Sequence, residues 1–141
     1  MVIQRIQTLL LLIAAILVGV FCLTPVAVEA AAGAEADAVK HFICEAPVLL
    51  IVNILIAVLL VITIFLYRNL RQQMKVTLMC MMLIAASIVA SVFVLYNQWP
   101  GAEFYWFGGI LLLGASLIFA LAAYRSMKKD YKLLRSMDRL R

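Results

Sequence analysis

The sequence carries little charge for its length. Only 13% of its 141 residues are charged, against about 25% in an ordinary soluble domain, and 67% are hydrophobic. A chain this short exposes a large fraction of its surface, so one water-soluble core cannot bury so many apolar side chains. The composition therefore excludes a soluble globular domain and a disordered chain. The net charge of +5 does not indicate nucleic acid as a partner, because the basic residues flank apolar runs.

The residues used for catalysis and metal binding are also scarce. His41 is the only histidine, so it would have to serve any catalytic triad from a loop. His41, Cys44 and Glu45 lie close together in the sequence, but a closed zinc site needs four suitable ligands, and we predict a solvated loop there. The sequence has no nucleotide-binding loop and no pattern of paired catalytic carboxylates. We expect no enzyme activity, no metal and no cofactor.

The sequence instead contains four long apolar runs. A helix needs about 20 mostly apolar residues to cross the roughly 30 Å of hydrocarbon in a bilayer. The runs hold no Asp, Glu, Lys, Arg or His in their interiors, and they are continuous rather than alternating, which favours helices over barrel strands. We predict an all-α fold, with a four-helix antiparallel membrane bundle over residues 1–124 and a cytoplasmic tail over residues 125–141. The predicted spans are residues 6–23, 46–67, 76–96 and 104–124.

The basic residues predict the orientation of this bundle. With four spans, all but one of the 12 Lys and Arg residues fall on one side, and only Lys40 falls on the other. Cytoplasmic loops carry an excess of Lys and Arg, so we predict that both termini are cytoplasmic. In the alternative, the first run and Val28-Glu29-Ala30 form a cleaved signal peptide, which would leave three spans.

The connection between the first two runs, residues 24–45, is rich in alanine with scattered acids. We expect it to be partly helical between Ala34 and Phe42. Cys22 and Cys44 lie near its two ends, on the outer side, where a disulfide can persist. A bridge between them is left open, because disulfides obey strict distance limits. Cys80, inside the third run, is expected to be a small buried residue.

A few polar and small residues within the runs predict helix packing. Asn53 is costly in lipid unless it bonds a neighbouring helix, and serines usually bond their own helix backbone. Small residues at four-residue spacing, as in Ala86/Ala90 and Ser116/Ala120, favour a compact bundle, although the same faces could serve a partner or a homodimer. The candidate polar residues within the spans are Asn53, Ser87, Ser91 and Ser116.

The tail has the pattern of an amphipathic helix. Apolar residues from Met127 to Leu140 recur every three or four positions, and the basic residues lie largely off that stripe. Such a helix suits anionic lipid head groups at the inner membrane surface, whereas the simpler alternative is an anchor that only sets topology. Asp138 has arginines at three-residue spacing, but Asp130 has none nearby, so we predict that Asp130 reaches an arginine across the cytoplasmic face. The candidate inner-face residues are Arg5, Arg68, Arg71, Asp130, Arg135, Asp138 and Arg139.

Three short segments resemble one protein family. The start, Ile3-Gln4-Arg5-Ile6-Gln7-Thr8, the loop Phe65-Leu66-Tyr67-Arg68-Asn69 and the end, Arg135-Ser136-Met137-Asp138-Arg139-Leu140-Arg141, resemble the domain of unknown function 4293 family. The resemblance implies a small four-pass protein of the bacterial inner membrane that keeps its first helix. No activity is established for that family. One departure is visible, because Asp130 is followed by Tyr131 where the family suggests an acidic pair.

Two functional hypotheses remain from the sequence. The first is a non-enzymatic envelope protein that packs with itself or with another membrane subunit. The alternative is a passive carrier or channel for a small or lipidic solute, which would need a water-accessible cavity near Asn53, Ser87 or Ser116.

Overall fold

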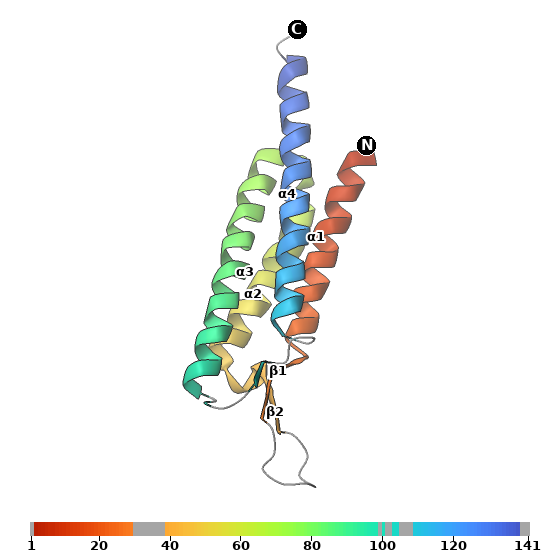
Figure 1. Ribbon diagram of the computed structural model, residues 1–141. Helices are drawn as coiled ribbons and strands as arrows, with labels where there is room; N and C mark the ends of the chain where they lie inside the picture. Colours follow the sequence, from red (N-terminus) through yellow and green to blue (C-terminus); the bar gives the residue numbers. More distant parts are fainter. Residues whose placement is uncertain (1, 30–38, 99, 101–102, 105–108, 139–141) are drawn as a thin grey trace.

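The structure is a computed structural model that describes residues 2–29, 39–98, 100, 103–104 and 109–138. Within these residues the chain forms four α-helices that lie side by side (Figure 1): α1 (Val2–Phe21), α2 (Pro47–Phe65), α3 (Leu70–Gln98) and α4 (Ile110–Asp138). Of the described helices, three are long and apolar enough to cross a membrane, namely Pro47–Arg68, Leu70–Gln98 and Ile110–Asp138. The apolar part of α1, Ile6–Phe21, is shorter. A membrane protein is therefore supported by the helices themselves.

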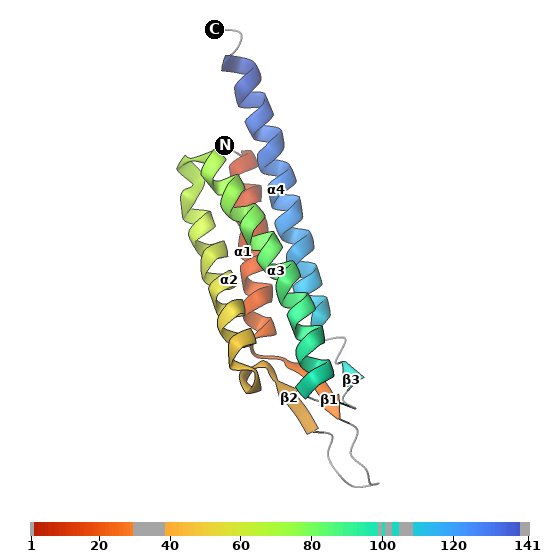
Figure 2. The same cartoon turned by 90° about the vertical axis from the view of Figure 1, so that its left-hand side faces the viewer.

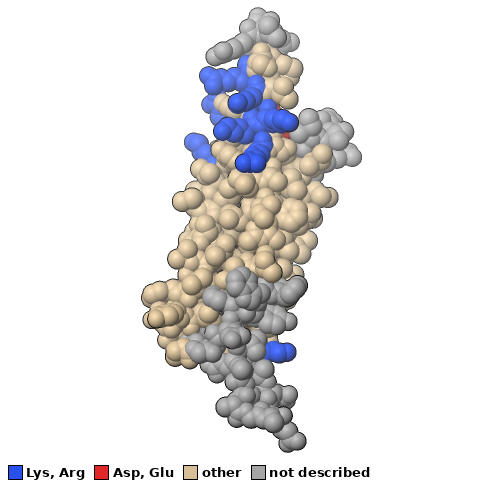
Figure 3. Space-filling view, in the orientation of Figure 1, with Lys and Arg blue, Asp and Glu red and all other residues tan. Residues whose placement is uncertain are grey.

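Each helix packs against two others. Helix α1 contacts α2 and α4, and α3 contacts the same two helices from the other side. The connections alternate between the two ends of the molecule, and α4 extends well beyond its neighbours at the end that also holds the N-terminus (Figure 2). We call this the basic end, because Lys and Arg side chains gather there (Figure 3). The turn between α2 and α3 and the first turns of α3 contribute Arg68, Arg71 and Lys75, and α4 contributes the others. The opposite end is the sheet end.

The sheet end holds three short antiparallel strands, in the order β2-β1-β3. Strand β1 (Pro25–Glu29) pairs with β2 (Val39–Phe42) and with β3 (Glu103–Phe104), and Ala27 lies opposite both His41 and Phe104. The expected helix between Ala34 and Phe42 is wrong where the structure describes it, because residues 39–42 are a strand, while residues 34–38 lie outside the described part. Alternating valines suit a pleated strand, and the pairing satisfies backbone groups of a chain leaving the bundle. The all-α prediction thus misses this sheet.

The helix boundaries depart from the predicted spans at two places. Phe104 lies in β3 rather than at the start of a helix, and α4 begins only at Ile110. At the basic end, α2 continues into a 3-10 helix, η2 (Leu66–Arg68), and α3 already begins at Leu70, so most of the loop predicted before residue 76 is helical. Residues 71–75, Arg-Gln-Gln-Met-Lys, are strong helix formers. Asn69 has a non-helical backbone (φ −117°, ψ 84°) and precedes α3, and its main-chain carbonyl accepts the Gln73 N–H at 3.0 Å.

The outer surface of the bundle is apolar, unlike that of a soluble protein. The buried interior combines apolar side chains with polar ones, and the outward faces carry many large apolar side chains. Water would disfavour such exposed side chains, whereas lipid accepts them and favours small or polar residues between helices. The buried polar residues are Gln7, Asn53, Thr63, Gln73, Thr77, Ser87, Ser91 and Ser116. The most exposed apolar side chains include Val48, Ile51, Phe65, Met82, Val89, Phe93 and Ile118.

Candidate functional site

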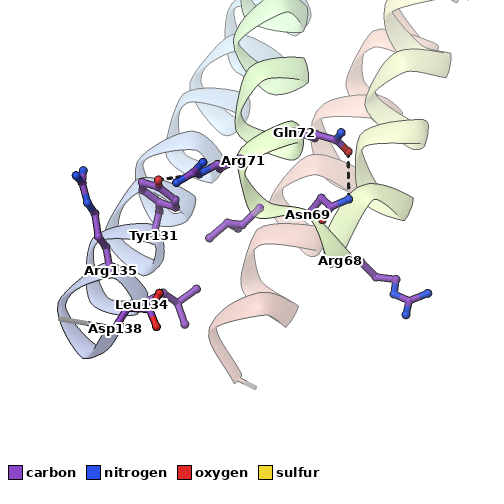
Figure 4. Close-up of a pocket in the computed structure, with 9 residues that line it drawn as sticks. Arg68, Asn69, Arg71, Gln72, Tyr131, Leu134, Arg135 and Asp138 are labelled. Carbon is purple, nitrogen blue, oxygen red and sulfur yellow. Dashed lines mark hydrogen bonds between the residues drawn. The ribbon is translucent and has the colours of Figure 1, made fainter. Parts of the chain in front are cut away.

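A polar pocket lies at the basic end, between the α2–α3 turn and the last turns of α4 (Figure 4). Its volume is about 450 Å³. It brings together four of the residues proposed from the sequence as inner-face contacts, namely Arg68, Arg71, Arg135 and Asp138. The complete lining is Arg68, Asn69, Leu70, Arg71, Gln72, Tyr131, Leu134, Arg135 and Asp138. The end of η2, the start of α3 and the tail of α4 each contribute, so the pocket depends on how these three segments are held.

Arg71 and Tyr131 join the two sides of the pocket. The Nε–H of Arg71 donates a hydrogen bond to the Tyr131 hydroxyl at 2.8 Å, and the guanidinium carbon lies 5.5 Å from the centre of the tyrosine ring. Hydrogen bonding and cation–π attraction therefore act on the same guanidinium. Tyr131 was predicted only as part of an apolar stripe. Its contact ties the start of α3 to the tail.

The other charged side chains of the pocket are exposed. Figure 4 shows Arg71 reaching toward Tyr131, whereas Arg68 and Arg135 extend outward from the two sides. Among the side chains that the structure describes, Asp138 and Arg135 form no ion pair, and pairing of Asp138 with the other arginine at three-residue spacing, Arg141, stays a prediction. Arg139 and Arg141 lie outside the described residues.

Below the pocket, Asp130 is held by α1. The side-chain amide of Gln7 donates a hydrogen bond to the Asp130 carboxylate, and Gln7 is only 2% exposed. The predicted partners were arginines, yet within the described side chains no ion pair joins Asp130 to Arg68 or Arg71. The Arg5 side chain lies outside the described part, so pairing with Arg5 stays a prediction. A neutral amide suits this buried position because burying a guanidinium costs far more.

A signal for the Gln7 contact was present in the sequence. The buried face of α1 recurs every three or four residues through Leu11, Ala14, Val18 and Phe21, and Gln7 lies one turn before Leu11 on the same face. A polar residue that continues an apolar stripe at a helix end needs a partner on the neighbouring helix. Here that partner belongs to α4, which packs on α1.

The candidate polar residues inside the bundle form hydrogen bonds with one another or with main-chain carbonyls. Asn53 donates to the Leu49 carbonyl at 2.8 Å and accepts the Ser87 hydroxyl at 2.9 Å, which links α2 to α3. Ser91 donates to the Ser87 carbonyl and Ser116 to the Leu113 carbonyl. All four candidate polar residues are buried. This arrangement matches the interhelical contact expected for Asn53 and the backbone bonds expected for the serines.

A second buried polar cluster was not anticipated from the sequence. Gln73, only 2% exposed, donates to the Thr63 carbonyl at 3.2 Å, and Thr77 donates to the Gln73 carbonyl at 2.8 Å. The Thr77 hydroxyl also lies 3.8 Å from the Met127 sulfur. Gln73 was assigned to a loop, although it lies on the same helical face as the buried Thr77, Cys80, Ile84 and Ser87. The cluster joins α2, α3 and α4 just below the pocket.

The second cavity is apolar and lies between α2 and α3 toward the sheet end. It has a volume of about 340 Å³ and includes Ala86, Ser87 and Ala90, but neither Asn53 nor Ser116. Ala86 is exposed and Ala90 is half-buried, so this small-residue pair faces outward rather than into the bundle. Of the three residues near which the carrier hypothesis needs a cavity, this groove includes Ser87, and its lining is mostly apolar.

The sheet end carries the candidate thiols and the histidine. Cys22 and Cys44 are free thiols, as is the buried Cys80. His41 Nδ1 lies 2.8 Å from a Glu45 carboxylate oxygen, so the histidine belongs to a local pair. Within the described part of the chain, no three potential metal ligands come together.

One protein family matches this chain. The family model described as Domain of unknown function (DUF4293) matches residues 3–140, so the chain belongs to that family, and the resemblance drawn from the ends and the α2–α3 turn is confirmed. No curated protein matches the chain, and no solved structure matches it.

Proposed function

We propose that this member of the DUF4293 family is an integral protein of the bacterial inner membrane that crosses the bilayer four times. The observation that carries this proposal is the distribution of side chains along the bundle. Figure 3 shows Lys and Arg gathered at one end, above a long belt without charged residues. Basic residues favour the cytoplasmic side, so we place the basic end and both termini in the cytoplasm.

The packing of α1 supports four spans rather than three. The whole helix has 20 residues and a length of about 30 Å, and its apolar part, Ile6–Phe21, is shorter, at about 24 Å. Its buried face packs on α2 and α4, and its Gln7 holds Asp130. Cleavage after this segment would leave the side of α4 that packs on α1 without its partner. A retained first helix therefore fits the interior better than a signal peptide.

We propose that the protein is a non-enzymatic subunit that packs with a second copy or with another membrane protein. The hydrogen bonds of the interior polar residues are made within the bundle, so these residues serve its stability. The apolar groove between α2 and α3 lies on the lipid-facing side and contains the outward pair Ala86 and Ala90. Small residues at four-residue spacing let another helix approach closely.

The experiment is co-purification of the tagged chain from membranes in mild detergent, combined with crosslinking. We expect a stoichiometric membrane partner or a dimer. Ala86→Leu and Ala90→Leu should weaken the association, because the added side chains fill the groove. Ala85→Leu is the matched control, since Ala85 is exposed on the same helix but outside the groove. A monomer in every detergent, with no partner and no crosslink, would contradict the subunit role.

A further inference from the structure

We propose that the pocket at the basic end is a binding site for a phosphate group. The group belongs either to the head group of an anionic phospholipid of the inner leaflet or to a small soluble phosphate compound. The lipid source rests on the proposed function, because it needs the basic end to face the cytoplasmic leaflet. The chemistry of recognition is the same for both sources.

The charges of the pocket favour an anion. Arg68, Arg71 and Arg135 come from three different segments, and Asp138 is the one acid in the lining, so the lining carries a net charge of +2. Guanidinium groups match the oxygens of phosphate in geometry as well as charge. Leu70 and Leu134 add an apolar wall, which suits the glycerol and upper acyl part of a lipid.

The Arg71 guanidinium is held in position by Tyr131 before any ligand binds. Its Nε–H is already bonded to Tyr131, and the tyrosine ring lies close to the guanidinium. The two terminal Nη groups have no partner among the side chains that the structure describes. A guanidinium fixed at one edge and open at the other loses less freedom when it binds an oxyanion. Arg68 and Arg135 are exposed and can turn toward the same ligand.

The position of the pocket along the membrane normal fits a head group. Helix α2 has 19 residues from Pro47 to Phe65, which gives a length of about 28 Å. That length nearly equals the hydrocarbon thickness of about 30 Å, so η2 and its Arg68 lie in the head-group layer. The pocket opens beside η2, at the depth where lipid phosphates lie.

Specific recognition differs measurably from general attraction between a basic tail and an anionic surface. General attraction depends on the number of basic residues near the surface and treats them as equivalent. Lys129 is an exposed basic residue of α4 outside the pocket lining, so it contributes only to general attraction. Arg71 contributes to both. The comparison of these two residues separates the two modes of binding.

The test is a titration of the purified full chain in uncharged detergent, followed by native mass spectrometry. The probes are dioctanoyl phosphatidylglycerol, dioctanoyl phosphatidylcholine and inorganic phosphate. We expect phosphatidylglycerol to bind more tightly than phosphatidylcholine. Arg71→Gln should weaken binding about tenfold, which is the size expected for one lost charge-assisted contact. Lys129→Gln should change it by less than about twofold, because exposed charges outside the pocket interact weakly.

A second variant keeps the test independent of folding defects. Asp138 is exposed and has no partner among the described side chains, so Asp138→Asn should leave the fold intact. Because it removes the acid of the pocket, it should tighten binding of the anionic probe several-fold. Arg71→Lys should recover only part of the lost affinity, since an ammonium lacks the planar fork.

Each outcome bears on the proposal. Tight phosphatidylglycerol binding without phosphate binding supports the lipid source, and inorganic phosphate binding that Arg71→Gln removes supports a soluble phosphate compound. Equal losses for Arg71→Gln and Lys129→Gln, or no tightening by Asp138→Asn, would overturn the site. Failure of the proposed topology is seen separately, by reporter fusions at the two termini, and leaves the binding measured in detergent unchanged.

Discussion

The two ends of the bundle are closed by different means. At the sheet end, Phe21, Ala27 and Ile43 are completely buried, and backbone pairing between strands covers the connection. At the basic end, the contacts between helices are polar, as in Gln7 with Asp130 and Arg71 with Tyr131. Apolar burial is strong and insensitive to salt, whereas polar contacts near water are weaker and adjustable. The comparison teaches that the basic end is the part of the molecule whose geometry a ligand or partner can change.

The largest expected effect on stability comes from a substitution in the packed interior of the sheet end. Phe21→Ala should lower the free energy of unfolding by about 3 kcal/mol, because it leaves a cavity in a closed interior. The measurement is unfolding by sodium dodecyl sulfate in mixed micelles, followed by circular dichroism. Phe65→Ala is the matched control, since Phe65 is 72% exposed and its replacement removes few packing contacts. Equal losses for the two variants would show that Phe21 is not part of a packed interior.

An intermediate effect is expected at the basic end. Gln7→Leu should cost about 1–3 kcal/mol, because it leaves the half-buried Asp130 carboxylate without its amide donor. The same unfolding titration measures the loss. Gln98→Leu is the control, since Gln98 is an exposed glutamine at the other end. If Asp130→Asn restores the stability of Gln7→Leu, the uncompensated charge is the cause, and no recovery would argue against this contact.

The smallest expected effect on stability comes from removing one hydrogen bond in the pocket at the basic end. Tyr131→Phe removes the hydroxyl that accepts the Arg71 N–H but keeps the ring, so it should cost only about 0.5–1 kcal/mol. Repeating the titration at several salt concentrations tests whether the remaining ring–guanidinium attraction is screened. Tyr124→Phe, on the same helix, provides the reference. A loss larger than that of Gln7→Leu would reverse the proposed ranking of the two contacts.

The sequence predicted the helices better than their connections, for a physical reason. A membrane helix is determined by its own apolar run, so helices occupy most of the four predicted runs. Pro47 lies in the first turn of α2, where proline is tolerated. The sheet depends instead on pairing between residues 25–29 and the distant residues 39–42 and 103–104. No local pattern of hydropathy contains that information. The start of α4 was misplaced for the same reason, because Phe104 pairs in β3, whereas the start of α3 was misplaced because its first turns are polar and lie outside the apolar run.

The candidate site was predictable in composition and not in geometry. Arg68, Arg71, Arg135 and Asp138 were identified from charge alone, and the structure gathers them around one pocket. The role of Tyr131 and the choice of Gln7 as the partner of Asp130 depend on which faces of α1, α3 and α4 meet. The charge pattern predicted Arg5, Arg68 or Arg71 as the partner of Asp130, and it gave no weight to Gln7, because an uncharged amide does not appear in a charge pattern.

Helix α4 runs without interruption from the sheet end into the tail. Its 29 residues give a rigid rod about 43 Å long, so a tilt of about 10° at one end displaces the other by roughly 7 Å. In the proposed topology, the last turns of α4, with Arg135 and Asp138, therefore move whenever the membrane-spanning part of the same helix tilts. Occupancy at one membrane face and helix tilt in the lipid are then mechanically coupled through a single element.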